Sequence, residues 1–113
     1  MVQHSLNAMF EHYLNKRISL EKIVEKMCHN PAILFRIKNR GYIRIIYFAD
    51  LVVLNPNKSY KVDKSNILYK CGWSPFEGKK FSSVVTHTFV NGNLVYNDGE
   101  FDESYRGSKI LFK

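Results

Sequence analysis

The sequence predicts an α+β fold in which helices come first and strands follow. Apolar residues recur at helical spacing between residues 5 and 35, and runs of β-branched and aromatic residues replace them from Gly41 onward. Asn91-Gly92 lies between two such runs and is a strong hairpin signal, because both residues tolerate the positive φ of a type I′ turn. A chain of 113 residues is the size of one domain and can bury a modest core.

Two amphipathic helices are expected in the first third of the chain. The first carries an apolar stripe that residues 15–17 interrupt; its members are Leu6, Met9, Phe10, Tyr13 and Leu14. The second begins after Ser19, a good N-cap, with Glu21 in the first turn, where a negative charge meets the helix dipole. Its stripe consists of Leu20, Ile23, Val24 and Met27. Asn30-Pro31 is expected to close this helix and to begin a short third one, since proline is common at the first helical position.

The remaining residues are expected to form short strands joined by turns. The predicted strands cover residues 43–47, 49–54, 59–62, 84–90 and 93–96. Residues 66–78 are expected to be an ordered loop with a brief helical turn at 67–69, and Asp98-Gly99 should make a further turn.

The charge of the chain permits several partners. Seventeen Lys and Arg residues against ten Asp and Glu give a net charge of +7, which can mark a nucleic-acid binder. The basic residues are scattered, however, and the densest group, from Arg36 to Arg44, alternates with apolar residues. We therefore expect a solvated basic surface, with nucleic-acid binding or contact with an acidic protein as less favoured alternatives.

The sequence shows neither a membrane-spanning nor a secretory segment. Its apolar stretches are only a few residues long, whereas a membrane span needs about 20. No basic start followed by an apolar block resembles a signal peptide. We expect a cytoplasmic location without a membrane partner, and two reduced thiols at Cys28 and Cys71 rather than a disulfide.

No catalytic, cofactor-binding or metal-binding residue is expected in this chain. Its histidines form neither a His-x-His pair nor an i, i+4 pair and should lie at or partly below the surface: His4, His12, His29 and His87. Cys28 should pack at the buried edge of the second helix, and no glycine-rich phosphate loop is present. Five aromatic residues could stack on single-stranded nucleic acid but are expected in the core: Tyr42, Tyr47, Phe48, Trp73 and Phe76.

Four sequence blocks nevertheless resemble one family. The Asn-Pro-Ala turn within residues 24–35 is similar to the last-helix segment of bacterial dihydroorotases. Gly41-Tyr42-Ile43-Arg44 followed by Ala49-Asp50-Leu51 resembles the amidohydrolase pattern Gly-x-Ile-x-x-Gly-x-x-Ala-Asp-Leu. Residues 74–78, Ser-Pro-Phe-Glu-Gly, and residues 85–92 resemble the family's Ser-Pro-x-x-Gly stretch and its hairpin. From Val2 to Lys113, the chain therefore resembles the C-terminal segment of a bacterial dihydroorotase of the amidohydrolase superfamily.

The resemblance implies a division of the chain and a parent enzyme. Residues 1–40 would be the terminal helices of a (β/α)8 barrel, and residues 41–113 the strands of a small composite β-sandwich with a C-terminal tail. The parent would reversibly hydrolyse dihydroorotate to N-carbamoyl-aspartate in pyrimidine biosynthesis. In that family a zinc centre activates water and an Asp transfers the proton. No position here matches the zinc ligands or that Asp, so no cofactor is expected in this chain and the segment alone should be inactive.

The resemblance also implies partners and leaves one local question open. The missing barrel would be the natural partner, and helix stripes that it no longer covers should favour a homo-oligomer. A non-catalytic interaction module is the alternative, as some dihydroorotase-like chains are partners of aspartate transcarbamoylase. Ile46 stands where the family has its second Gly. Because a β-branched residue resists positive φ, either the turn is rebuilt or two strands fuse.

Overall fold

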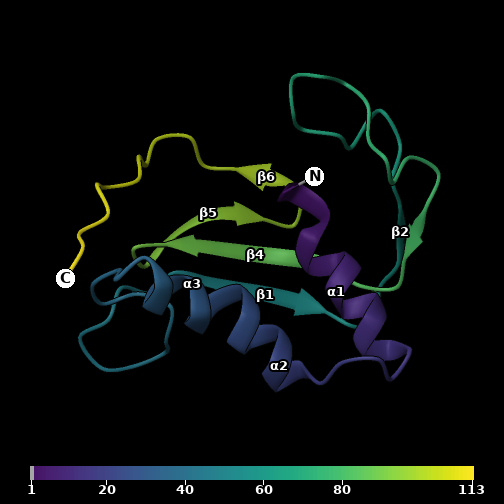
Figure 1. Cartoon of the computed structure of the whole chain (residues 1–113). Coiled ribbons are helices and arrows are strands. Elements are labelled where there is room, and N and C mark those ends of the chain that lie inside the picture. The colour runs from purple at the N-terminus through teal and green to yellow at the C-terminus, as the bar shows by residue number, and fades with distance from the viewer. Residues whose placement is uncertain (1) are drawn as a thin grey trace.

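The computed structural model describes residues 2–113, which form two helical segments, a four-stranded sheet and a small two-stranded sheet (Figure 1). The α+β class predicted from the sequence is confirmed. A 3-10 turn at Val2–His4 leads into α1, Ser5–Leu14. Two reverse hydrogen bonds end α1, from the Lys16 N–H to the Tyr13 carbonyl and from the Arg17 N–H to the His12 carbonyl. Lys16 takes the left-handed conformation that this Schellman motif requires, with φ +58°.

The second helical segment runs without a break through the expected stop at Asn30-Pro31. It comprises α2 (Leu20–Val24), a π-helical stretch (Glu25–His29) and α3 (Asn30–Leu34). Ser19 caps it as predicted, its side chain accepting from the Lys22 N–H at 3.2 Å. The prediction of a break was wrong because the Asn30 N–H bonds back to the Glu25 carbonyl. This wider turn lets a proline without an N–H continue the helix.

The main sheet is antiparallel and has the strand order β1-β4-β5-β6. Its strands are β1 (Leu51–Asn55), β4 (Val84–Val90), β5 (Asn93–Asn97) and β6 (Glu100–Phe101). The β4–β5 hairpin is confirmed, with φ +51° at Asn91 and +82° at Gly92. The expected strand at 59–62 is present as β2 (Tyr60–Lys61), which pairs with β3 (Lys80–Phe81) in a separate sheet. Residues 67–69 contain no helical turn.

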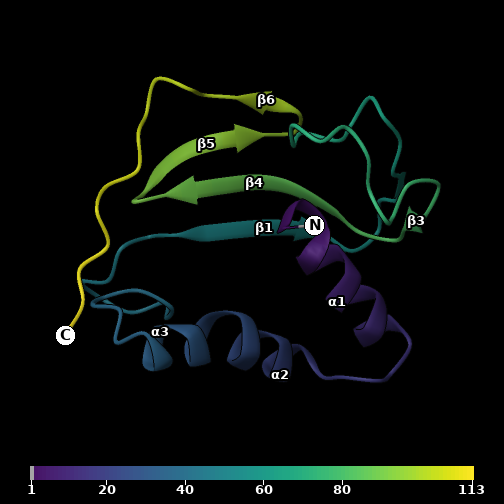
Figure 2. The same cartoon turned by 45° about the horizontal axis from the view of Figure 1, so that its top comes forward.

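The buried core lies beside the small sheet and not under the large one. The largest fully buried side chains belong to His4, Val62, Phe81 and Ser83, where α1 meets β2 and β3. Phe10 and Ile23, one from each predicted stripe, are also buried, and α1 contacts α2. Every residue of the four-stranded sheet, by contrast, keeps part of its surface exposed. Figure 2 shows α1 near one end of this sheet and the second helical segment running alongside β1.

The predicted strand at 43–47 is a turn. The Tyr47 N–H donates to the Arg44 carbonyl at 3.1 Å, and Ile46 at the third position has φ +67°, as in a type II turn. The Phe48 N–H bonds to the Asn39 carbonyl, so the segment closes on itself and does not pair with a strand. The open question at Ile46 is thus resolved in favour of a turn, with isoleucine in a conformation that suits glycine.

Replacing Ile46 with glycine should stabilise the fold. A left-handed conformation costs a non-glycine residue about 1–2 kcal/mol, whereas glycine loses about 0.5–1 kcal/mol more chain entropy on folding. The Ile46 side chain is 85% exposed, so little packing is lost. We expect the free energy of unfolding to rise by about 0.5–1 kcal/mol in urea titrations. Ile45→Gly, at an exposed neighbour without positive φ, is the control and should lower it.

Candidate functional site

A row of polar side chains fixes the N-terminal helix to the rest of the chain. Gln3, Asn7 and Glu11 are spaced four residues apart and share one helix face. The Gln3 amide donates to the Asn66 carbonyl at 2.6 Å and accepts from the Leu68 N–H at 3.0 Å. Buried Asn7 donates to the Ser83 carbonyl at 2.8 Å, and Glu11 accepts from the Ser82 N–H. This polar row was not predicted beside the apolar stripe, although its i, i+4, i+8 spacing is readable in the sequence.

His4 is enclosed by aromatic rings. It is 0% exposed, and four ring centroids lie 5.9–6.4 Å from its own: Tyr60, Tyr69, Phe76 and Phe81. Within the described residues, neither ring nitrogen of His4 has a hydrogen-bond partner, and the same holds for the buried Tyr69 hydroxyl. The expectation of a surface or partly buried histidine was wrong here, because the ring fills the centre of an aromatic cluster that sequence spacing does not reveal.

Burial makes His4 a source of acid sensitivity. Desolvation disfavours the imidazolium ion and lowers the pKa of His4 below its ordinary 6.5. The unfolded chain then binds more protons than the folded chain below about pH 6.5. The contribution of neutral His4 to the free energy of unfolding is therefore complete above that pH. It is lost as the pH falls toward the lowered pKa, by at most about 1.4 kcal/mol per pH unit.

The test is to measure urea unfolding between about pH 7 and pH 5. His4→Phe keeps an aromatic ring and should flatten the pH dependence. His12→Gln, at an exposed position on α1, should leave the dependence unchanged. A wild-type curve that stays flat across this range would contradict the assignment of His4 as the acid-sensitive group.

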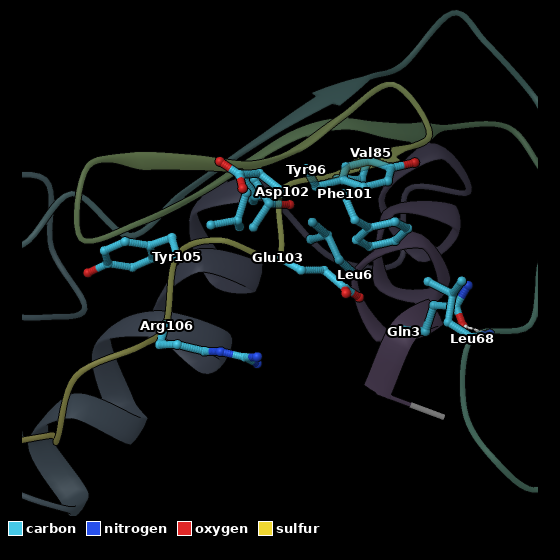
Figure 3. Close-up of a pocket in the computed structure, with 13 residues that line it drawn as sticks. Gln3, Leu6, Leu68, Val85, Tyr96, Phe101, Asp102, Glu103, Tyr105 and Arg106 are labelled. Atoms are coloured by element: carbon cyan, nitrogen blue, oxygen red, sulfur yellow. Dashed lines mark hydrogen bonds between the residues drawn. The ribbon is translucent and has the colours of Figure 1, made fainter.

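An open pocket of about 590 Å³ lies between α1, the sheet and the C-terminal tail (Figure 3). Leu6, Val85 and Phe101 contribute apolar surface, and Glu103 and Arg106 lie along the tail. At its edge, the Asp102 carboxylate accepts from the Ser104 hydroxyl and N–H, which lowers the pKa of Asp102. Among the described residues, the lining contains no His or Cys. The pocket suits the burial of apolar groups and offers no paired nucleophile and base.

A second polar cluster joins the helical part to the hairpin. Asp50 pairs with the Arg40 guanidinium and accepts from the Asn91 N–H at 2.8 Å. Arg40 also stacks on the Phe48 ring, 4.2 Å from its centroid. The Asn91 side chain donates to the Tyr105 hydroxyl at 2.8 Å, and the Gly92 N–H bonds to the Ala49 carbonyl. Ala49-Asp50 thereby positions the hairpin turn.

The other histidines and the cysteines are dispersed. His29 stacks on Tyr42 with ring centroids 4.1 Å apart, and His87 lies in β4 beside the Thr86 hydroxyl. Cys28 and Cys71 are free and exposed, so the expected burial of Cys28 was wrong. Of the aromatic residues expected in the core, Phe48 and Trp73 are exposed.

Residues 2–113 contain neither a metal-ligand cluster nor a membrane-spanning helix. In this part of the chain, no three His, Cys, Asp or Glu side chains gather as metal ligands would. Its helices are also too short or too polar for any of them to cross a bilayer.

Comparison with known proteins identifies the family. A model of the amidohydrolase family matches residues 1–95. The chain therefore belongs to the amidohydrolase family, as its sequence blocks indicated. A dihydroorotase from Pyrococcus horikoshii is 36% identical over 94 residues, which are 83% of this chain and 22% of that protein. A dihydroorotase from Methanosphaera stadtmanae is 30% identical over 107 residues, covering 92% of this chain and 25% of its own length.

Solved structures share the fold. An L-hydantoinase (dihydropyrimidinase) from Arthrobacter aurescens superposes with a TM-score of 0.70 at 36% identity, over 80% of this chain and 20% of that one. A D-hydantoinase superposes with a TM-score of 0.75 at 23% identity, a likeness that shows a shared fold alone. The chain thus spans about a fifth to a quarter of the length of the proteins that it matches.

The zinc implied by the family does not fit the residues described. A zinc site needs three or four convergent His, Cys, Asp or Glu ligands. The buried His4 faces aromatic carbon atoms, and the other three histidines lie on separate elements. No catalytic step through a metal is therefore assigned to these side chains.

Proposed function

We propose that this chain forms the C-terminal part of a dihydroorotase-type amidohydrolase. The parent enzyme would reversibly hydrolyse dihydroorotate to N-carbamoyl-aspartate in pyrimidine biosynthesis. The similarity to dihydroorotases across 83% of the chain carries this proposal. In it, residues 1–40 are the closing helices of the barrel, and residues 41–113 contribute strands and the tail to a composite sandwich.

The exposed surfaces of the chain support this assignment of residues 1–40 and 41–113. The faces of the four-stranded sheet are half-buried at most, and the apolar pocket of about 590 Å³ lies open beside them. Such surfaces gain about 25 cal/mol for each Å² of apolar area that a neighbour removes from water. A barrel and further strands supplied by the rest of the parent would cover them.

In this proposal the chain completes the fold of the parent, and the rest of the parent contains the catalytic residues. The parent's zinc and its catalytic Asp would come from residues outside the chain. The Asp50–Asn91 and Asn7–Ser83 contacts would hold the helices and strands in register beside the barrel. We expect the isolated chain to bind no zinc stoichiometrically and to hydrolyse no dihydroorotate.

A reconstitution experiment tests the proposal. The Pyrococcus horikoshii dihydroorotase is prepared without the 94 residues that match this chain, and dihydroorotate hydrolysis is measured with and without the chain added. Activity should require both polypeptides. Turnover by the chain alone with zinc, or no recovery on mixing under conditions where both parts are folded, would argue against it. If hydrolytic activity returned only with a similarly shortened hydantoinase or allantoinase, tested on that enzyme's own substrate, the proposed substrate class would change.

A non-catalytic interaction module is the second candidate, favoured by the exposed apolar side chains of α3. Self-association through the helix faces stays a prediction. Burial of Phe10 and Ile23 removes part of the surface first expected to drive it, whereas Ile33 and Leu34 remain exposed. Sedimentation equilibrium distinguishes a monomer from a dimer, and nucleic-acid binding, the least favoured alternative, should be absent at low salt.

A further inference from the structure

The turn between β4 and β5 contains Asn91-Gly92, the only Asn-Gly step in the chain. Asparagine is a chemically labile residue, and it deamidates most readily before glycine, because glycine has no side chain to hinder attack by its main-chain nitrogen. Each of the other asparagines precedes a larger residue. The two residues that give the turn its positive φ are therefore also the pair with the greatest intrinsic tendency to deamidate.

Deamidation at this step needs only water as a co-reactant. The Gly92 main-chain nitrogen attacks the side-chain carbonyl carbon of Asn91, the bond from that carbon to Nδ2 breaks, and ammonia leaves with the proton that Gly92 gives up. The product is a cyclic imide. Water then opens one of the two C–N bonds of the imide ring, which leaves aspartate or isoaspartate at this position. The chain gains one negative charge without any oxidant, reductant or cofactor.

The fold holds the attacking nitrogen in an unreactive arrangement. The Gly92 N–H donates to the Ala49 carbonyl at 3.0 Å, and the Asn91 N–H donates to the Asp50 carboxylate at 2.8 Å. The nitrogen must give up its proton and turn toward the Asn91 side chain before it can attack. Both changes break hydrogen bonds of the turn. The turn therefore has to leave Ala49-Asp50 before Asn91 can react.

The C-terminal tail holds the amide group that must leave. Asn91 Nδ2 donates to the Tyr105 hydroxyl at 2.8 Å and to the Ser108 hydroxyl at 3.0 Å. Figure 2 shows the tail after β6 passing the turn between β4 and β5. The described residues of this tail form neither a helix nor a strand, and such segments open at a lower free-energy cost than the strands of a sheet. Opening of the tail would release the Asn91 side chain.

We propose that Asn91 is a deamidation site whose rate the C-terminal tail controls through Tyr105 and Ser108. All the controlling contacts lie within residues 49–108, so they do not depend on which outer surfaces the rest of a parent enzyme covers. The new carboxylate would lie beside that of Asp50, and like charges at short range repel. A transient opening of the tail would thus leave a lasting weakness in the hairpin. This modification lies outside the proposed hydrolytic reaction.

The test follows deamidation of the whole chain at mildly alkaline pH by peptide mass spectrometry, with the aspartate and isoaspartate products separated by chromatography. Asn91 should react about a hundredfold more slowly in the folded chain than in urea. Tyr105→Phe combined with Ser108→Ala should speed the reaction of the folded chain about tenfold. Ser104→Ala is the matched control and should leave the rate unchanged, because its hydroxyl bonds to Asp102 in the same tail.

Further variants keep the result interpretable. Circular dichroism confirms that each variant is folded, and Ser108→Ala alone, at an exposed position, should give a smaller increase of the same sign. Asn91→Asp mimics one product and should lower the urea midpoint more than Asn91→Gly, which adds no charge. Equal rates in the folded chain and in urea, or an unchanged rate in the double variant, would overturn control by the tail. An intact Asn91 after long incubation in urea would overturn the site itself.

Discussion

Replacing Gly41 with alanine is expected to lower the free energy of unfolding by about 3 kcal/mol. Gly41 has φ +83°, and a methyl group there would lie 2.5 Å from the Ala32 Cβ and 2.8 Å from the Cys28 carbonyl oxygen. The left-handed backbone costs alanine about 1–2 kcal/mol, and forcing the loop away from the helix costs a similar amount again. Urea unfolding followed by far-ultraviolet circular dichroism measures the sum.

Two other glycines separate the causes of this loss. Gly72 has φ +69° with open space around it, so Gly72→Ala should show the backbone cost alone, about 1 kcal/mol. Gly107 has neither positive φ nor a close neighbour, and Gly107→Ala should be nearly neutral. Adding Ala32→Gly to Gly41→Ala should recover part of the loss through favourable coupling. Equal losses at Gly41 and Gly72 would show that the helix does not approach the loop as closely as described.

Replacing Asp50 with alanine is expected to lower the free energy of unfolding by about 2 kcal/mol. The Arg40 side chain is only 13% exposed and would keep its charge without a partner. The Asn91 N–H at the hairpin turn would lose its acceptor at the same time. Asp50 itself is 36% exposed, so the cost lies below that of breaking a fully buried pair, but the largely covered Arg40 guanidinium would stay partly desolvated.

The matched control is an exposed ion pair. Lys58 lies 3.5 Å from Asp98, and both side chains are more than half exposed. Lys58→Ala should therefore change the free energy of unfolding by less than about 0.5 kcal/mol. Combining Arg40→Ala with Asp50→Ala should cost less than the sum of the two single changes, as thermal and urea unfolding can both measure. Strict additivity would contradict a direct pairing.

Local signals were sufficient where neighbouring residues settle the backbone. Asn91-Gly92 set the hairpin, because both residues accept the positive φ of its turn. Ser19 set a helix start, since its hydroxyl accepts a hydrogen bond from the Lys22 N–H three residues on. The family resemblance could likewise be read from short blocks, and the match of residues 1–95 to the amidohydrolase family confirms it. None of these inferences depended on contacts between distant segments.

Local signals failed where the composition of a segment and its actual hydrogen bonding differ. Residues 43–47 have strand composition but turn back on themselves, with the Phe48 N–H bonded to Asn39. Pro31 predicted a helix break, which a widened turn at Glu25 absorbs. Ile46 shows the same conflict, since the turn persists although the residue suits it poorly.

By itself, the sequence determined the α+β order, the first helix, the hairpin and membership of the amidohydrolase family, because each rests on residues close together in the chain. Only the tertiary structure decided that His4 lies among four rings, that Asn7 reaches Ser83, and that residues 33–48 meet residues 109–113. These contacts join residues that are far apart in the chain. Burial and charge pairing depend on which segments meet in space, and spacing along a chain does not specify that.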